Sequence, residues 1–525
     1  MTALHAQIRN VKINRDSVAG YPPCEVAIAL NPANPNQLAA GAVLDYVYLS
    51  SDGGNTWTQS SMNSQYGVYG DPSLIYDKWG NLYYSHLSNP PLYLGHWIDR
   101  IVVQKSTNNG VDWSDENGLG YSPPAKNQDK EWISADWTSS QHMGNLYVAW
   151  TQFDNYGSTL QNDSSNILFA GYDYNYSKWN VPVRVNDRAG DCIDDDNTVE
   201  GAVPAVGPNG EVYLSWAGPV GIMFDKSTDG GLTWGQDVFV NSQEGGWAMS
   251  VSGVPRCNGL PITAADISNS PYRGNIYINW SDQSNGLTNP DIFISKSTDG
   301  GVTWSDAIRV NDDDTERPQF FPWMCVDPKT GFIYVVFYDR RNTTGKETEV
   351  YLARSKDGGD TFENFKISES TFDFPNNFRL FFGDYNNITA YNGKIYPIWT
   401  RIEVGDVNNA DDDKLSILVA PISDEDLVTE TENDEAVVHE YRLFNNYPNP
   451  FNPNTIISYT VPERSFVSLK VYNVVGELVS VLVDDYKSPG FYEVSFDGQN
   501  LSSGTYIYEL KAGAFSDEGK MLLLK

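Results

Sequence analysis

Short apolar runs, each followed by a glycine turn and a strand rich in aromatic residues, recur along most of the chain. Clear examples are residues 71–87, 203–218 and 321–339. Apolar or aromatic runs of this length, bounded by glycine, proline and asparagine, predict β-strands joined into antiparallel pairs. The pattern therefore predicts an all-β structure built from repeated strand pairs.

A second recurring segment follows the strand pairs. It has the form Ser-x-Asp-Gly-Gly-x-Thr-Trp and occurs, with variations, at residues 50–57, 106–113, 227–234, 297–304 and 355–362. Its Asp can accept backbone N–H groups, its glycines supply positive φ, and its Trp adds buried apolar surface. We expect a tight turn, with a third strand leading into it and a fourth strand leaving it.

The spacing predicts seven such units. The interval from residue 106 to residue 227 has room for two units, and a degenerate turn ends there at Trp179. A seventh unit follows the last turn and ends at its third strand, residues 415–422. Residues 8–16 resemble the fourth strands of other units, so we expect them to complete the last blade and close the ring. Closure of seven four-stranded blades leaves no free sheet edge.

The recurring turn resembles the Asp-box, or BNR repeat, of sialidase-like β-propeller proteins, although Asn108 replaces the Asp in the second copy. The resemblance implies a β-propeller over residues 8–422; sialidases have six blades, whereas the spacing here predicts seven. It also implies that the boxes are scaffold, on the face opposite the functional site.

The C-terminal part of the chain has a different pattern. Residues 423–442 are acidic and predict a linker, whereas residues 443–525 alternate strands with turns, as in a small immunoglobulin-like β-sandwich. Three motifs stand out in this part: Tyr447–Pro453 (YPNPFNP), Lys470–Glu477 (KVYNVVGE) and Ser503–Tyr506 (SGTY). They resemble the C-terminal sorting domain of type IX secretion. The resemblance implies recognition by that machinery and a place outside the cell or on a bacterial surface.

Composition narrows the class of partner. The formal net charge of −33 disfavours nucleic acid, and no segment reaches the roughly 18 apolar residues of a transmembrane helix. Residues 1–7 are expected to be the remainder of a leader peptide. Cys192 and Cys257 fall in loops expected on one face, which would allow a disulfide.

Carboxylates mark the expected site. In a propeller, the loops that enter the first strands gather around the central axis on one face. Five blades begin near an acidic residue at this face: Glu25, Asp71, Glu131, Glu200 and Asp384. Paired carboxylates act as acid and base, or acid and nucleophile, in glycoside cleavage. The candidate catalytic residues are therefore Glu25, Asp71, Glu200 and Asp384, with Tyr385 as a nucleophile if the resemblance to sialidases holds.

Arginines occupy one phase of the repeat on three adjacent blades. Arg256, Arg317 and Arg379 each lie four residues before the start of a first strand, so they could converge on one anion. Further candidates for substrate binding are Arg340, Trp247 and Trp323. The alternative is that the arginines pair with the carboxylates, which then cap strand ends and solvate the channel.

A metal site is suggested by a loop late in the ring. The alternating residues Asp406, Asn408, Asp411 and Asp413 suit Ca²⁺, although a solvated charge run has the same pattern. No motif for an organic cofactor is present.

Two classes of function remain open from the sequence. One is a secreted, carbohydrate-active enzyme, a glycoside hydrolase or a lyase, acting on anionic glycans in the manner of sialidases. The other is a non-catalytic extracellular protein that binds a glycan or glycoprotein, or has a structural role at the surface. Fold alone does not choose between them.

Overall fold

The chain forms two units in the computed structural model, Met1–Leu427 and Val428–Lys525. The structure describes residues 8–15, 21–91, 95–375, 380–403, 414–427, 441–444, 446–487, 490–513 and 515–525. Regular structure in these residues is almost entirely β, and a 3-10 helix, η2 (Asp424–Asp426), follows the last strand of the first unit. Among the described residues, no helix has the length and apolar character needed to cross a bilayer. The predicted all-β class is confirmed.

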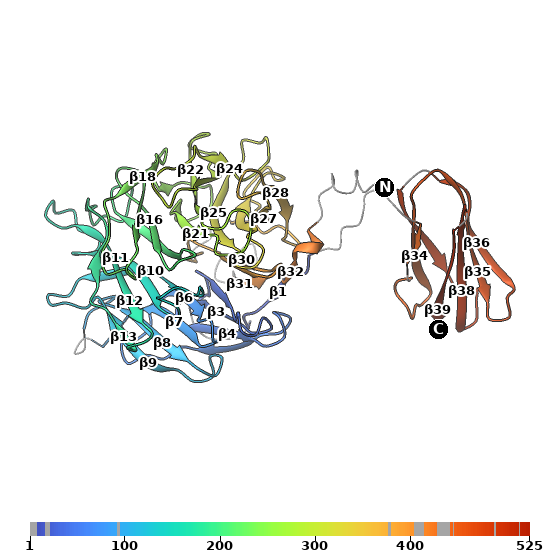
Figure 1. The fold of residues 1–525 in the computed structure, drawn as a ribbon, viewed down its shortest axis with the longest axis horizontal. Coiled ribbons are helices and arrows are strands. Elements are labelled where there is room, and N and C mark those ends of the chain that lie inside the picture. Colours follow the sequence, from blue (N-terminus) through green and yellow to red (C-terminus); the bar gives the residue numbers. More distant parts are fainter. Residues whose placement is uncertain are drawn as a thin grey trace. The chain divides into compact units, whose positions relative to one another are not determined.

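Seven antiparallel sheets of four or five strands make up the described part of the first unit (Figure 1). The first contains β2 (Ala27–Leu30), β3 (Leu38–Ala42), β4 (Tyr46–Ser50) and β5 (Thr58–Ser61). The second contains β6 (Gly70–Tyr76), β7 (Leu82–Leu87), β8 (Ile101–Ser106) and β9 (Ser114–Leu119). The third contains β10 (Asn127–Ala135), β11 (Leu146–Phe153), β12 (Ser165–Asp173), β13 (Lys178–Trp179) and β14 (Val183–Arg184).

The remaining four sheets follow in chain order. The fourth contains β15 (Glu200–Val206), β16 (Val212–Ala217), β17 (Ile222–Ser227) and β18 (Val238–Asn241). The fifth contains β21 (Ile262–Ala265), β22 (Ile276–Asp282), β23 (Asp291–Ser297) and β24 (Ile308–Arg309). The sixth contains β25 (Gln319–Val326), β26 (Ile333–Asp339), β27 (Glu349–Ser355) and β28 (Glu363–Lys366). The seventh contains β29 (Asn387–Tyr391), β30 (Lys394–Glu403), β31 (Lys414–Val419), β32 (Ile422–Ser423) and β1 (Val11–Lys12). A short hairpin, β19 (Ala248–Met249) and β20 (Cys257–Asn258), lies between the fourth and fifth sheets in the chain.

The first strands of the seven sheets form a closed ring. Each contacts the first strand of the next sheet, and β29 of the seventh contacts β2 of the first. Apolar clusters fill the spaces between neighbouring sheets. On β7, for example, Tyr84 packs in the cluster toward the first sheet and Tyr83 in the cluster toward the third. Both faces of each sheet are therefore covered, as in a β-propeller, and the strands are apolar or aromatic on both sides.

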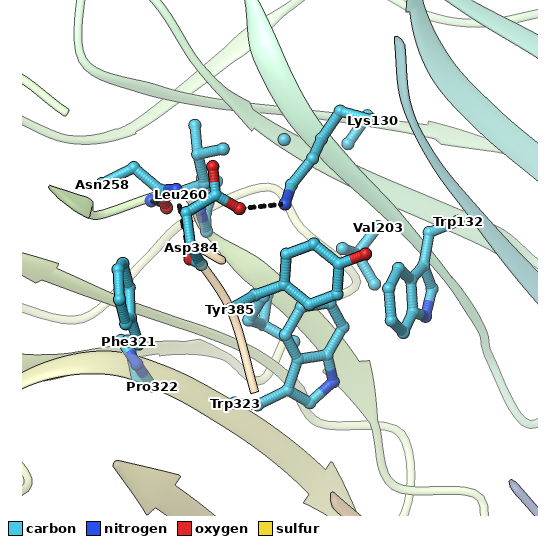
Figure 2. A pocket seen from close by; sticks show the side chains of 14 residues that line it. Lys130, Trp132, Val203, Asn258, Leu260, Phe321, Pro322, Trp323, Asp384 and Tyr385 are labelled. Atoms are coloured by element: carbon cyan, nitrogen blue, oxygen red, sulfur yellow. Dashed lines mark hydrogen bonds and ion pairs between the residues drawn. The ribbon is translucent and has the colours of Figure 1, made fainter. Parts of the chain in front are cut away.

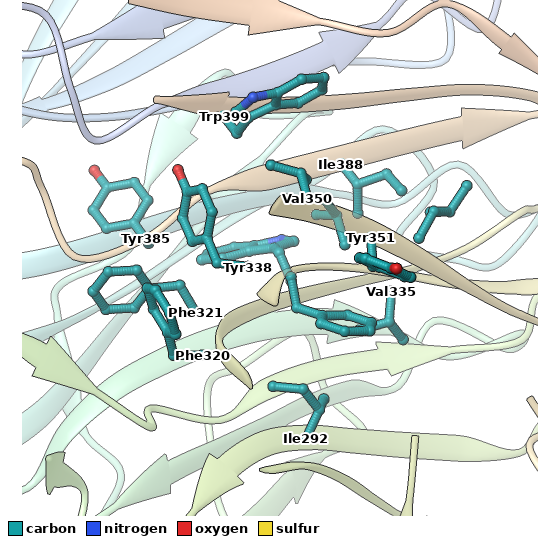
Figure 3. Close-up of a cluster of buried hydrophobic side chains, with 14 of the residues drawn as sticks. Ile292, Phe320, Phe321, Val335, Tyr338, Val350, Tyr351, Tyr385, Ile388 and Trp399 are labelled. Carbon is teal, nitrogen blue, oxygen red and sulfur yellow. The ribbon is translucent and has the colours of Figure 1, made fainter. Parts of the chain in front are cut away.

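The largest apolar cluster lies among the fifth, sixth and seventh sheets (Figure 3). Tyr338 stacks on Phe320 with ring centroids 5.3 Å apart and donates its hydroxyl hydrogen to the carbonyl of Thr400 at 2.8 Å. This bond crosses from the sixth sheet to the seventh. A buried tyrosine that has found an acceptor thus joins two sheets without an unpaired polar group.

The N-terminal segment completes the seventh sheet, as the sequence predicts. Strand β1 pairs with β31, and Val11 lies opposite Val419. Asn14 then accepts a hydrogen bond from the backbone N–H of Ile417 at 2.8 Å. The matching residues Asn186 and Asn311 accept equivalent bonds in the third and fifth sheets, at 2.7 and 2.9 Å. The similarity of these sequence segments therefore reflects one shared hydrogen-bonding role.

The recurring turns share one hydrogen-bond pattern. In the copy at residues 297–304, one oxygen of Asp299 accepts the N–H groups of Val302 and Thr303, and the other accepts the Thr303 hydroxyl. The hydroxyl of Ser297 accepts the N–H of Gly301 at 2.9 Å. The same bonds recur in the turns around Asp52, Asp229 and Asp357. The motif is thus a self-contained polar turn between the third and fourth strands.

The second unit has two antiparallel sheets that share one apolar core. One contains β33 (Arg442–Leu443), β34 (Asn454–Val461) and β37 (Gly490–Asp497). The other contains β36 (Leu478–Lys487), β35 (Ser465–Asn473), β38 (Gly504–Ala512) and β39 (Phe515–Leu523). Buried residues alternate along β34 and β35, where Ile457 and Leu469 are examples. This is the period-two pattern of sheets with one covered face.

The expected Cys192–Cys257 disulfide is wrong. Both residues are free thiols, as are Cys24 and Cys325. Cys257 lies on β20 within the large apolar cluster, whereas Cys192 lies in the loop that leads toward the fourth sheet. Burial raises the pKa of the Cys257 thiol and keeps it protonated.

Candidate functional site

A cleft with a volume of about 340 Å³ opens where the first strands of the early sheets begin. Its polar lining consists of Glu25, Asp71, Asp129 and Arg256. Its aromatic lining consists of Tyr21, Tyr69, Trp97, Tyr156 and Phe381. The volume falls within the range of small-molecule sites, and a few convergent polar groups between aromatic walls are typical of them.

An unusual backbone feature presents these polar groups. Glu25, Asp71 and Lys130 all have left-handed φ values, of 50°, 48° and 54°. The register between the first and second strands shifts beside Asp71 and Lys130, which marks β-bulges. A bulge re-aims the side chains around it, and left-handed non-glycine residues concentrate at functional sites. The fold therefore accepts local strain at the point where three charged side chains meet.

Two cations converge on one carboxylate at the base of the cleft. Asp384 is buried, accepts a short hydrogen bond from Arg256, and lies 3.2 Å from the ammonium nitrogen of Lys130. Burial opposes its ionisation, but the charges of Arg256 and Lys130 hold the pKa of Asp384 well below its usual range. Arg256 also lies 3.9 Å from Glu25 and 3.6 Å from Asp194. One guanidinium thus connects carboxylates from three segments of the chain.

The carboxyl groups of Glu25 and Asp71 have the opposite character. Burial, followed by the neighbouring charge of Asp71, raises the pKa of Glu25 well above its ordinary value. Burial also raises the pKa of Asp71, although Lys130 counteracts the rise. Glu25 and Asp71 are hydrogen-bonded to each other. Two close carboxyl groups in a buried site share one proton because both cannot be ionised together.

A second group of acids surrounds this pair. Burial raises the pKa values of Asp129, Glu131 and Glu200, with further rises from Asp71 or Asp194. One oxygen of Glu131 and one of Glu200 are buried without a hydrogen-bond partner. A buried carboxyl oxygen without a donor is more stable in the neutral acid. The axis therefore carries several carboxyl groups with raised pKa values around Asp384, whose pKa is lowered.

The aromatic wall is held by edge-to-face contacts. Trp97 contacts Tyr69 and Tyr156 with ring centroids 5.3 and 5.8 Å apart and interplanar angles of 83° and 85°. Tyr156 donates its hydroxyl hydrogen to Asp194 at 2.5 Å. Trp97 stays 39% exposed, so part of its face is open to a ligand. Exposed, fixed aromatic rings of this kind can stack on the apolar face of a sugar.

Below the cleft lies a smaller cavity of about 20 Å³, near the space of one water molecule (Figure 2). Trp132 and Trp323 pack there with ring centroids 4.1 Å apart, and Tyr385 lies 6.0 Å from each. Lys130 and Asp384 line its upper side, so their ion pair separates the cavity from the cleft. Aromatic packing thus closes the central channel beneath the carboxylates.

The structure places the sequence-derived candidates in different surroundings. Glu25 and Asp71 line the cleft, and Asp384 lies beneath it. Glu200 lines neither the cleft nor the small cavity. Tyr385 faces the smaller cavity, where burial raises its pKa well above the ordinary value, so its phenol stays neutral. These positions favour the first two acids over Tyr385 for chemistry in the cleft.

Among the arginines, only Arg256 lines the described part of the cleft. Arg317 donates to the carbonyl of Gly345. Arg340 is buried and donates to Ser252 and Thr348, and burial lowers its pKa to about 10. The predicted Arg379 and the predicted metal ligands Asp406, Asn408, Asp411 and Asp413 lie outside the described residues.

The two tryptophans predicted to bind substrate also lie outside the cleft. Trp247 is buried, donates to the carbonyl of Thr198 at 3.2 Å, and packs against Leu260. Trp323 lines the smaller cavity and not the cleft. Within the residues that the structure describes, no group of three or more His, Cys, Asp or Glu side chains is arranged to hold a metal ion. The bonds of Arg256 to the acids of the axis are consistent with this finding.

The sequence reasoning missed several residues of the cleft. Asp129 and Lys130 stand directly before Glu131, the residue near which the sequence predicts the start of the blade. The bulge shifts the strand by one residue at this point, and Asp129 lines the cleft whereas Lys130 lines the smaller cavity. Tyr156 comes from the loop between β11 and β12. The charged run Asp129–Glu131 before an apolar strand was the available signal for the first two.

Comparison with known families identifies the C-terminal unit. Residues 445–523 match the model of the secretion system C-terminal sorting domain. This domain directs type IX secretion, so the protein is secreted or held at the cell surface. A search of curated proteins finds no match to the chain.

Solved structures that match the chain at low identity include two sialidases and an α-L-arabinanase. The Hadza microbial sialidase Hz136 has 13% sequence identity over 75% of each chain, with a TM-score of 0.40. The α-L-arabinanase of Penicillium chrysogenum has 14% identity over 80% of this chain and 99% of its own, with a TM-score of 0.42. The NanB sialidase of Streptococcus pneumoniae has 10% identity over 75% and 84%, with a TM-score of 0.42. Likeness at this level assigns no activity to the chain.

Proposed function

We propose that the protein is a secreted glycoside hydrolase whose active site is the cleft around Glu25 and Asp71. The observation that carries this proposal is a hydrogen-bonded carboxyl pair with raised pKa values, set between aromatic walls and beside the ionised Asp384. Glycoside cleavage needs one protonated and one ionised carboxyl group on either side of the scissile bond. A pair that shares one proton supplies both forms, provided that a bound sugar parts the two carboxyl groups to the roughly 5–5.5 Å of a retaining enzyme.

The proposed framework is a seven-bladed propeller with Asp-box turns, followed by an immunoglobulin-like sorting sandwich. The closed ring of contacts among seven first strands supports the blade count. The shared hydrogen bonds of the recurring turns support their assignment as Asp-boxes. The two sheets with a common core in the second unit support the sandwich.

The environments of the two acids suggest a division of roles. Glu25 has the more strongly raised pKa, so it holds the shared proton and acts as the general acid. The positive charge of Lys130 favours the ionised form of Asp71, which then serves as base or nucleophile. Acids whose environments separate their pKa values are typical of such enzymes. Arg256, bound to Glu25, Asp194 and Asp384, fixes the position of the general acid.

The charge balance favours a neutral sugar in the cleft. Arg256 is engaged with protein carboxylates, and Lys130 is paired with Asp384. No other Arg or Lys lines the described part of the cleft. A uronic or sialic carboxylate would therefore meet further carboxyl groups there, and like charges at short range repel. Hydrolysis also fits better than a lyase reaction, because a lyase needs the uronic carboxylate that this charge balance disfavours. The buried His86, whose pKa burial lowers to about 4, does not line the cleft.

The test is product release from matched neutral, sialylated and uronic glycans, with Glu25→Gln and Asp71→Asn beside the wild type. Each variant should lower kcat on a natural glycan by roughly 10²–10⁴-fold, the usual contribution of a general acid or base. An aryl glycoside with a good leaving group needs no protonation. On that substrate Glu25→Gln should recover most of its rate, whereas Asp71→Asn should not.

Asp306→Asn, an exposed change elsewhere on the first unit, is the matched control and should keep full activity. Adding a chelator to the same assay tests the predicted calcium site at residues 406–413. Retained activity in both cleft variants would overturn the proposed site. Binding of a glycan with no turnover by the wild type would instead identify a binding protein.

A further inference from the structure

A second large cavity lies at the end of the ring opposite the cleft. It has a volume of about 590 Å³ and is lined by the loops that join the first strand of each sheet to the second. All seven sheets contribute, from Pro32 in the first loop to Tyr391 at the end of β29. It is therefore the second mouth of the central axis, separated from the cleft by the packed rings of Trp132, Trp323 and Tyr385.

The lining of this mouth is basic. Among the described residues, this lining contains Lys78, Arg273 and Lys329, and no Asp or Glu. The basic pocket, as we name this mouth, stands out in a chain with 68 acidic and 35 basic residues. In such a chain, three cations around one cavity and no acid in its lining concentrate positive potential at one place.

None of the three cations forms an ion pair with another described residue. The ammonium group of Lys78 donates to the carbonyl of Thr138 at 2.9 Å. The guanidinium of Arg273 donates to the carbonyls of Ser268 and Pro208, at 2.7 and 3.4 Å. These neutral acceptors orient Lys78 and Arg273 without cancelling their charge. They leave donors available to a bound anion.

The acidic residues nearest to these cations in the sequence bind the backbone of their own loops. Four of the seven loops begin with a buried Asp that accepts a backbone N–H two residues later: Asp77, Asp136, Asp266 and Asp327. These bonds keep the carboxylates out of the cavity lining while fixing the loops that carry the cations. The loop shape is thus set before any ligand binds.

Aromatic groups complete the basic pocket. Trp137 donates its indole N–H to the carbonyl of Tyr76 at 2.7 Å, which fixes its ring, and the ammonium group of Lys329 lies 5.3 Å from the ring centroid of Tyr391. Rigid rings beside cations suit a ligand that combines a flat apolar face with a negative group. We infer that the basic pocket binds an acidic saccharide unit, through a sulfate or carboxylate group held by Lys78, Arg273 and Lys329.

The test is titration calorimetry with a sulfated disaccharide, its unsulfated counterpart and inorganic sulfate. The wild type should bind the sulfated disaccharide, and the unsulfated form should bind at least tenfold more weakly. The double variant Arg273→Gln with Lys329→Gln should lose roughly 10–100-fold in affinity, as expected for lost charge-assisted hydrogen bonds.

The matched control is Lys178→Gln with Arg188→Gln, two exposed residues outside the pocket that change the net charge equally. It should bind like the wild type. Inorganic sulfate that binds as tightly as the disaccharide would support the anion site and identify a free anion as its ligand. Equal affinity for the unsulfated sugar, or unchanged binding by the pocket variant, would overturn the inference. Because the readout is binding, it is independent of hydrolysis in the cleft.

Discussion

Glu131 shows how burial sets the ionisation of the axis. One of its oxygens accepts a hydrogen bond from Ser85 at 3.2 Å, while the other is buried without a partner. Burial, followed by the charge of Asp71, raises its pKa well above the ordinary 4.5. An acid whose pKa is raised by folding stabilises the folded state below pH 4.5, and that stability is lost as pH rises toward the folded pKa.

Glu131→Gln removes this pH-dependent cost while keeping the shape of the side chain. We expect the variant to match the wild type near pH 4 and to gain free energy of unfolding relative to it by up to about 1.4 kcal/mol per pH unit above that. Urea unfolding followed by tryptophan fluorescence measures this, because all 15 tryptophans lie within residues 57–399. The exposed Glu244→Gln should show no such trend. A difference that stays constant from pH 4 to pH 8 would contradict the argument.

At this scale the sequence predicts the position of some acids and little of their environment. Repeat phase placed Glu25 and Asp71 at the start of first strands, and both line the cleft. Repeat phase does not predict the different positions of Lys130 and Glu131. A bulge moves the phase by one residue there, and the apolar pattern of the sequence does not reveal it. Which acids carry charge depends on neighbours in space. Arg256, for example, pairs with Asp384 although no repeat spacing in the sequence links the two residues.

At the scale of elements, the two glycines of the recurring turn have different structural roles. Gly300 and Gly301 both have positive φ, 75° and 85°. A Cβ on Gly300 would meet only the Lys226 ammonium group, at 3.6 Å, whereas a Cβ on Gly301 would fall 2.2 Å from the Phe224 ring. Phe224 belongs to the preceding sheet and packs against the Trp304 of this turn. The lack of a side chain at Gly301 therefore leaves room for Phe224 of the neighbouring sheet.

Alanine at each position separates backbone strain from steric exclusion. Gly300→Ala should lower the free energy of unfolding by about 1–2 kcal/mol, the cost of a left-handed alanine. Gly301→Ala should cost about 1–3 kcal/mol more, because Phe224 must also move. Chemical denaturation followed by tryptophan fluorescence gives both values. Equal losses would show that the contact with Phe224 relaxes freely.

Element types follow from the sequence more completely than contacts between elements. The alternation of apolar runs with glycine turns predicts the paired strands, and the turn motif predicts where third strands end. The motif also predicts positive φ at its glycines. It does not predict that Gly301 faces Phe224, since that contact joins two blades whose packing the local pattern does not encode.

For the whole molecule, the match between the two ends of the first unit is what predicts that the ring closes. The missing fourth strand of the last sheet and the unassigned segment at residues 8–16 together predicted closure, and β1 pairs with β31. The charges of the two mouths could not be predicted in the same way. They depend on which loop residues face the axis once the ring has closed.

Closure makes the N-terminal segment a test of the architecture. A chain lacking residues 1–15 loses β1, the buried Ile13 and the two hydrogen bonds of Asn14 to β31, and leaves the edge of β31 open. We expect a lower Tm for the tryptophan-monitored transition and self-association that grows with protein concentration, because an open edge pairs with other strands. Calorimetry and analytical ultracentrifugation measure the two effects. A synthetic peptide of residues 8–15 added in trans should restore both, whereas a scrambled peptide of the same composition should restore neither. A truncated chain that melts like the full one and stays monomeric would show that the ring holds without its closing strand.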